Sequence, residues 1–141
     1  MRIVLDTYVL VAGLLSPFGP PGEIVRMVSS GELMLCLDAR ALAAYDGVLH
    51  RPKFGFAPGP GAALLDFVEY RSRMVASSPL LAPLPDTDDE PLLEIAPAGG
   101  AECLVTGNVG HFPEGRRQAV LVVSPAGFRK HNRSRGEPVS H

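Results

Sequence analysis

The chain has 141 residues, of which 46% are apolar, and its formal net charge is −2. This length predicts one domain of ordinary size, and the apolar fraction excludes a disordered chain. No apolar run approaches the roughly 18 residues that a membrane helix needs. The apolar start of the chain carries Asp6 and lacks the long uncharged segment of a signal peptide. We therefore expect a cytoplasmic protein that does not interact with a membrane.

The charge is unevenly distributed along the chain. Residues 116–141 contain six Arg or Lys side chains and one Glu, a net of +5, so residues 1–115 carry −7. A short basic end of this kind is usually solvated and disordered. We therefore divide the chain into a domain over residues 1–130 and a basic, disordered tail over residues 131–141.

The hydrophobic pattern predicts alternating strands and helices. In chain order we expect a strand at 2–5, an apolar segment at 7–15, a helix at 22–30, a strand at 33–37, a helix at 38–49, a loop at 51–61, a helix at 62–73, a short strand at 74–76, a proline-rich connection at 77–88, a helix at 90–98, strands at 102–106 and 119–123, and a final helix at 124–130. Pro97 should kink the helix in which it lies.

This alternation predicts βα units and a mostly parallel sheet, with right-handed crossovers that place helices on both faces. We expect a three-layer α/β/α fold with a central parallel sheet of four or five strands and the first strand in the middle. Cys36 and Cys103 lie in apolar runs, and their spacing matches neither a zinc motif nor a disulfide framework. Both should be reduced core thiols on opposite sides of the first strand.

In parallel sheets the ligand site lies beyond the carboxyl ends of the strands. Asp6 ends the first strand, and Asn108 and His111 follow the strand at 102–106. Four acidic residues precede the helix beside that strand: Asp86, Asp88, Asp89 and Glu90. We expect Asp6, Asn108 and one of the four to converge on one cleft.

Each of these residues also has a simpler explanation. Asp6 could be only a helix cap, the acidic cluster a solvated loop, and Asn108 a turn former. For His111 we prefer the simpler explanation, a loop residue. Thr7 and Thr106 could bond to neighbouring carboxylates or only close local turns.

Three segments resemble motifs of the PIN domain family. IVLDTYVLVAGLLSPFGPP resembles the family's first strand and helix, DTDDEPLLEIA its central acidic motif, and ECLVTGNVGHF its final strand and loop. YDGVLHRPKF and VVSPAGF resemble further segments of the toxin branch of the family. The order and spacing of these motifs are fairly specific, and the resemblance covers residues 1 to about 128.

The resemblance implies a Mg²⁺- or Mn²⁺-dependent endoribonuclease, the toxin of a toxin–antitoxin pair. Mg²⁺ is a hard cation that prefers oxygen ligands, and a bound dication activates water and steadies the charge on a phosphate. The implied partners are an RNA substrate and a cognate antitoxin that binds the site groove. A homodimer is also compatible with it.

The family's four acidic positions map onto this chain only in part. Asp6 matches the first and Asp89 the third, whereas the second falls on Ala44 and the fourth on Asn108. Tyr8 stands where the family has Asn. The implied catalytic residues are Asp6, Asp89 and Asn108, and the implied metal ligands are Asp6, Asp89, Asp86, Asp88 and Glu90.

Two alternatives stay open. The missing acids and the bulky Tyr8 favour a catalytically inactive PIN-fold binding or scaffold module. A receiver-like phosphotransfer domain would also have an acidic pocket, but no Lys follows a later strand where that class needs one.

Overall fold

The structure is a computed structural model that describes residues 1–51 and 58–136. Its strands are β1 (Arg2–Leu5), β2 (Met34–Leu37), β3 (Arg73–Met74), β4 (Cys103–Val105) and β5 (Val122–Val123). Its α-helices are α1 (Thr7–Leu15), α2 (Pro20–Ser30), α3 (Ala39–Leu49), α4 (Pro58–Arg71), α5 (Glu90–Gly99) and α6 (Pro125–Gly136). No helix in these two ranges has the length and apolar character needed to cross a bilayer.

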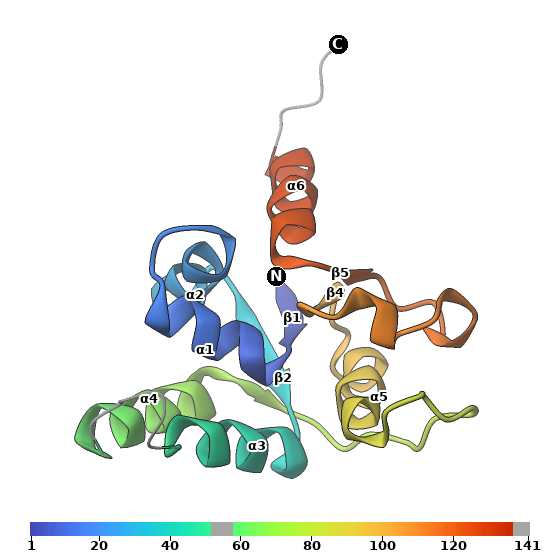
Figure 1. Cartoon of the computed structure of the whole chain (residues 1–141), viewed down its shortest axis with the longest axis horizontal. Helices are drawn as coiled ribbons and strands as arrows, with labels where there is room; N and C mark the ends of the chain where they lie inside the picture. Colours follow the sequence, from blue (N-terminus) through green and yellow to red (C-terminus); the bar gives the residue numbers. More distant parts are fainter. Residues whose placement is uncertain (52–57, 137–141) are drawn as a thin grey trace.

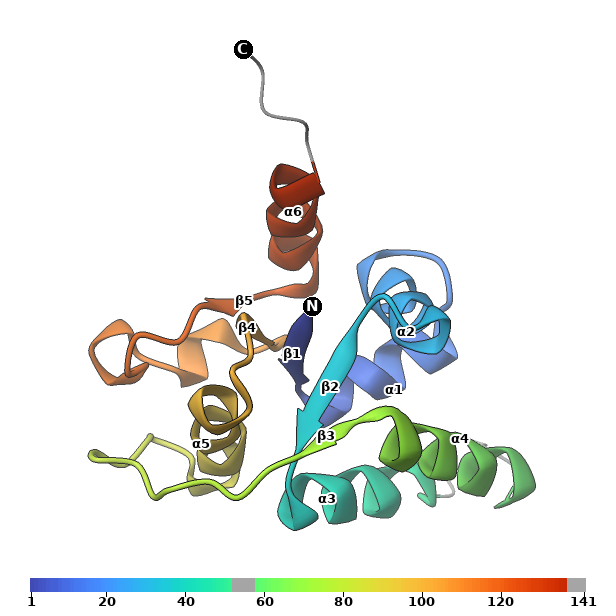
Figure 2. The same ribbon diagram turned by 180° about the vertical axis from the view of Figure 1, so that it is seen from behind.

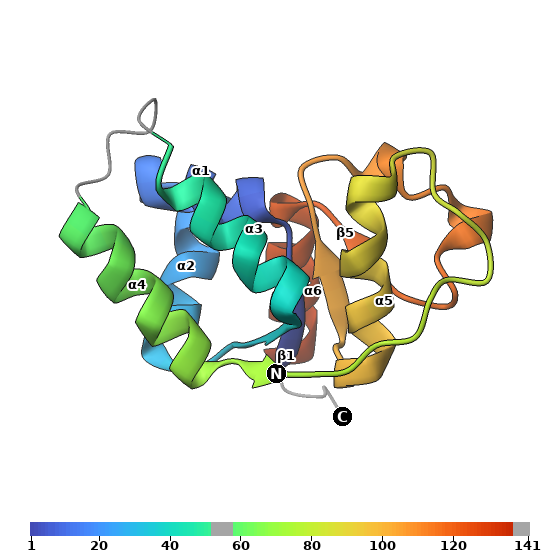
Figure 3. The same ribbon diagram turned by 90° about the horizontal axis from the view of Figure 1, so that it is seen from below.

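The five strands form one parallel sheet in the order β3-β2-β1-β4-β5 (Figures 1 and 2). The chain moves in one direction from β1 to β3 and then crosses back to β4, so right-handed connections put α1–α4 on one face and α5 on the other. Figure 3 shows this arrangement, with the strands between the two groups of helices. The three-layer α/β/α fold predicted from the sequence is confirmed.

The first strand is central, as predicted. Ile3 lies opposite Leu35 of β2 and opposite Cys103 of β4, and it has no exposed surface. Cys36 and Cys103 are buried thiols on the two neighbouring strands. The solid apolar run in β1 thus reflects burial on both faces of the sheet.

Local signals in the sequence explain where the helices begin and end. The Asp38 carboxylate caps α3 by accepting a hydrogen bond from the Ala41 N–H. Gly31 ends α2 in the left-handed region, with φ of 86°. Gly99 allows α5 to approach β2, because a Cβ there would lie 2.7 Å from the Cys36 sulfur. The helix continues across Pro97 to Gly99.

Several element boundaries differ from prediction. Strand β5 contains only Val122 and Val123, and Ala119, the first residue of the predicted strand, instead forms a turn with Gln118, both with positive φ. Residues 58–61 belong to α4 and not to the predicted loop, whose residues 52–57 lie outside the described part of the chain.

The last helix also departs from the predicted boundary. It was expected to end at Lys130, but α6 continues to Gly136. His131 explains part of this extension, because its Nε2 lies 2.7 Å from Glu102 Oε2. Residues 137–141 of the predicted tail lie outside the described residues.

Candidate active site

A cavity of about 580 Å³ lies where the carboxyl ends of β1 and β4 meet α3 and the start of α5. Four carboxylates line it, from Asp6, Asp86, Asp88 and Asp89. Its other polar or cationic lining residues are Thr7, Tyr8, Arg40, Arg51, Thr87, Asn108 and His111. The predicted convergence of Asp6, Asn108 and a member of the acidic cluster on one cleft is therefore confirmed.

Asp6 is held at the centre of the sheet edge by two hydrogen bonds. Its Oδ1 accepts from the Tyr8 N–H at 3.1 Å and so caps α1, and its Oδ2 accepts from the Thr106 hydroxyl at 2.8 Å. Thr106 is fully buried, and its Oγ1 also accepts from the Asn108 N–H at 3.0 Å. Thr106 therefore bonds to a carboxylate and closes a local turn, the two roles that were predicted as alternatives.

Asp86, Asp89 and His111 form a compact group of ionisable side chains in the cavity. One ligand atom from each lies within 4.8 Å of the other two, and His111 Nδ1 is 3.2 Å from Asp89 Oδ2. Burial raises the pKa of Asp89, and the carboxylates of Asp86 and Asp6 raise it further, while His111 acts in the opposite direction. The site therefore concentrates negative charge that a cation would offset.

The acidic cluster does not enter the cavity as a whole. The 3₁₀ turn η2 (Thr87–Asp89) and the first turn of α5 point successive side chains in different directions. Glu90 is not among the described residues that line the cavity; its Oε2 accepts a hydrogen bond from the Leu84 N–H at 2.9 Å and holds the proline-rich connection. Glu90 was predicted as a metal ligand, but its carboxylate bonds to the Leu84 backbone and does not line the cavity.

Two positions where the sequence departs from the family pattern face the cavity. Ala44 is exposed on α3 and lines the wall, so no carboxylate enters from this position. Tyr8 is 53% exposed, and its hydroxyl oxygen accepts a hydrogen bond from Arg51 Nη1 at 3.1 Å. The ring is thus fixed beside the cavity and does not close it.

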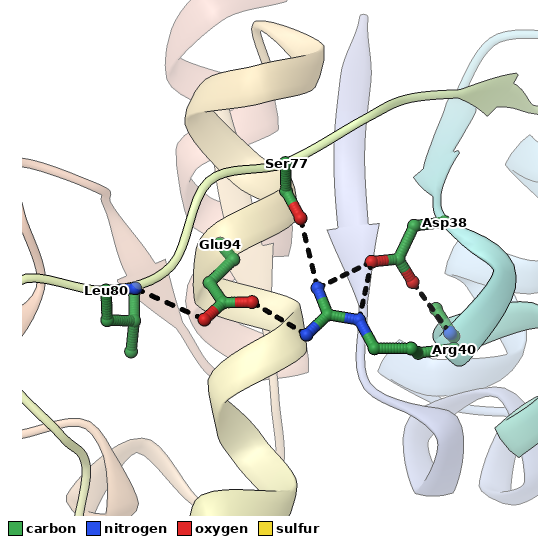
Figure 4. A network of polar contacts seen from close by, with 6 residues as sticks. Asp38, Arg40, Ser77, Leu80 and Glu94 are labelled. Atoms are coloured by element: carbon green, nitrogen blue, oxygen red, sulfur yellow. Dashed lines mark hydrogen bonds and ion pairs between the residues drawn. The ribbon is translucent and has the colours of Figure 1, made fainter.

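Arg40 connects α3 to α5 beside the same cavity (Figure 4). Its guanidinium donates to Asp38 Oδ2 through Nε and Nη2, at 2.9 and 2.6 Å, and its Nη1 lies 2.7 Å from Glu94 Oε1. Glu94 Oε2 also accepts from the Leu80 N–H, and Arg40 reaches Ser77 Oγ. These bonds to Asp38 and Glu94 raise the pKa of Arg40. The network fixes the distance between two walls of the cavity.

Arg40 and Arg51 were not among the predicted site residues, and His111 was expected to be only a loop residue, but all three line the cavity. A helix was predicted to begin at residue 38, but nothing in the sequence indicates that Arg40 turns toward Glu94, a helical residue more than fifty positions away. His111 offered a signal, because it follows β4 within six residues of Val105. This position at the predicted edge of the site was the available signal, so the preferred explanation of His111 as a loop residue alone is corrected by its place in the cavity.

The class of protein is thus a parallel three-layer α/β/α domain with carboxylates gathered at the carboxyl edge of its sheet. The PIN domain family model matches residues 2–110, which is most of the chain. The chain therefore belongs to the PIN domain family, a family of metal-dependent nucleases that bind divalent ions and act on RNA. No curated protein and no solved structure matches the chain significantly.

Proposed function

We propose that this protein is a divalent-metal-dependent endoribonuclease and the toxin of a toxin–antitoxin pair. The observation that carries the proposal is the presence of Asp6, Asp86, Asp89 and His111 in one cavity of a PIN fold. The toxin role and the cognate antitoxin follow from the resemblance of the flanking segments. We propose that the antitoxin binds over this cavity.

The donor set fits a divalent cation. Asp86 and Asp89 offer carboxylate oxygens, and Asp6 adds a third carboxylate whose charge reaches Asp89. Both Mg²⁺ and Mn²⁺ accept such ligands, but an imidazole nitrogen suits Mn²⁺ better than Mg²⁺. With His111 beside Asp89, we expect the site to prefer Mn²⁺.

When bound, the cation would activate water and neutralise charge that develops on the phosphate. The residues of the chain have separate tasks around it. Thr106 orients the Asp6 carboxylate, and Asn108 can hydrogen-bond to an attacking water without adding negative charge. Arg51 also lines the cavity and offers a cation to the RNA backbone.

A gel assay on unstructured RNA tests this function. We expect slow cleavage in Mn²⁺, slower cleavage in Mg²⁺, and none in EDTA. Asp89→Asn should abolish the cleavage, whereas Asp46→Asn, at an exposed aspartate on α3 that does not line the cavity, should leave it unchanged. Cleavage that persists in EDTA would contradict a metal-dependent mechanism.

The exposed Ala44 supports a second candidate, a PIN-fold binding or scaffold module without activity. Ala44 faces the cavity at the position where the family pattern has Glu. A scaffold would bind RNA or an antitoxin without cleaving RNA in any metal. Absence of cleavage even after acids are introduced at positions 44 and 108 would favour this candidate.

A further inference from the structure

A second, apolar groove adjoins the acidic cavity on the far side of Tyr8. It has a volume of about 160 Å³ and lies between α1 and α2 and the start of α6. Val9, Ala12, Pro21 and Pro125 form its apolar walls. Asp6, Tyr8 and Asn108 line both the groove and the acidic cavity, so the two spaces adjoin at these side chains.

Tyr8 is fixed at both of its ends. Its backbone N–H donates to Asp6 Oδ1, and its hydroxyl accepts from Arg51 at 3.1 Å. About half of the residue is nevertheless exposed, at 53%. An exposed aromatic ring that is already ordered loses little conformational entropy when a flat ligand stacks on it.

We propose that the groove beside Tyr8 is a nucleobase subsite for single-stranded RNA, an inference that rests on the proposed function. The base of a nucleotide next to the phosphate in the acidic cavity stacks on the Tyr8 ring and enters the apolar walls. The Asn108 amide NH₂ can donate to the edge of that base, while the amide oxygen remains available to the attacking water. A base-paired nucleotide cannot enter, because its base edge and faces are occupied in the duplex.

The composition of the groove favours a base over a phosphate. The side chains that belong to the groove alone are Val9, Ala12, Pro21 and Pro125, which provide no positive charge. The cations Arg40 and Arg51 instead line the acidic cavity. Charge complementarity therefore favours the RNA phosphate in the cavity and the nucleobase in the groove.

Fluorescence anisotropy with a labelled single-stranded RNA in Mg²⁺ tests the subsite, with RNA integrity checked on a gel after each titration. Tyr8→Ala should weaken binding about tenfold or more, and Tyr8→Phe should keep most of the affinity because stacking survives. Ala12→Leu should fill the groove and weaken binding as well. Tyr70→Ala on α4, at a tyrosine that is 86% exposed and lines neither space, is the control for loss of an exposed aromatic ring.

The outcomes separate this inference from the proposed nuclease activity. Binding without any cleavage would count against the nuclease and leave the subsite standing if Tyr8→Ala and Ala12→Leu still weaken it. Wild-type affinity in both variants, equal losses in Tyr8→Ala and Tyr8→Phe, equal binding of duplex RNA, or no binding by the unmodified protein would each overturn the subsite. Wild-type RNA affinity in Ala12→Leu alone would show that the base does not enter the groove and would overturn the subsite as well.

Discussion

The Thr106 hydroxyl donates a hydrogen bond to Asp6 Oδ2 at 2.8 Å, although the two residues are 100 positions apart in the sequence. Both are buried at adjacent strand ends, and Thr106 also accepts from the Asn108 N–H. A single hydroxyl therefore ties the central carboxylate of the site to the loop that carries Asn108.

We expect Thr106→Val to lower the free energy of unfolding by about 2 kcal/mol, because it removes a hydrogen bond to a buried carboxylate and leaves the Asn108 N–H without its acceptor. Urea denaturation measures the change. Thr106→Ser keeps the hydroxyl and should lose less. Equal stability of the Val variant and the native protein would show that this bond does not contribute.

Asp6 should be essential for ion binding. Isothermal titration calorimetry with Mn²⁺ should detect binding to the native protein, and Asp6→Ala should abolish it because the cavity loses its central oxygen ligand. Asp46→Ala removes a carboxylate of α3 outside the cavity and should bind as the native protein does. Unchanged Mn²⁺ binding in Asp6→Ala would remove Asp6 from the ligand set.

The raised pKa of Asp89 predicts a pH-dependent stability. Burial and the carboxylates of Asp86 and Asp6 raise this pKa, so the folded protein holds the proton more tightly than the unfolded chain does. Stability then falls as pH rises through the window between the two pKa values. In EDTA, we expect the free energy of unfolding to decline above about pH 4, the ordinary range of an aspartate.

Asp89→Asn should remove this part of the decline, and urea denaturation at several pH values compares the two proteins. Added Mn²⁺ should oppose the trend, because a cation binds the deprotonated carboxylate and its apparent affinity rises with pH. An identical pH profile in the Asn variant would show that Asp89 does not titrate differently in the folded state.

Carboxylates introduced at the two family positions that are not acidic in this chain should increase RNA cleavage. Ala44 and Asn108 both line the cavity, so Ala44→Glu with Asn108→Asp adds two carboxylates where an ion can reach them. Attraction between unit charges near a protein surface is about 4 kcal/mol at 4 Å before screening. We expect Mg²⁺-dependent RNA cleavage to rise at least about tenfold, or about 1.4 kcal/mol in barrier terms.

Ala43→Glu with Asn108→Asp is the control for that variant, because Ala43 is the exposed neighbouring position of α3 that does not line the cavity and the change in net charge is the same. The two variants differ only in whether the new glutamate lines the cavity. An equal gain in this control would attribute the effect to charge alone.

Arg40 should stabilise the fold more than a surface ion pair does. Asp38 and Glu94 are only 11% and 10% exposed at their side chains, so Arg40→Met leaves two largely buried carboxylates without their cation. Because the Arg40 side chain is 49% exposed, we expect a loss of about 1–3 kcal/mol in the free energy of unfolding. Arg40→Lys cannot reproduce the forked contacts and should recover only part of it, which urea denaturation would reveal.

The sequence was sufficient for the sheet and for part of the site. Asp6 and Asn108 each follow a buried apolar run, and in a parallel sheet the ends of neighbouring strands meet at one edge. It could therefore be predicted, from the positions of the strands alone, that Asp6 and Asn108 line the same cavity. The same reasoning located β1 at the centre, because an apolar run that has no polar alternation needs cover on both faces.

Side-chain direction within short turns could not be predicted in this way. Asp89 faces the cavity and Glu90 faces Leu84, because each residue at the start of a helix is rotated by about 100° from the one before. His111 approaches Asp89 only because two irregular segments fold toward each other across the sheet edge. Such contacts depend on loop geometry, which hydrophobic periodicity does not encode.

The close approach of Gly99 to Cys36 has a consequence at the opposite end of α5. Ten helical residues span about 15 Å, and Asp89 immediately precedes the first of them. Because a packed helix moves as a stiff rod over this length, a small tilt at its contact with β2 displaces Asp89 relative to Asp6. Gly99 and Cys36, which would not contact the ion, would thereby influence the ionic radius that fits between Asp89 and Asp6.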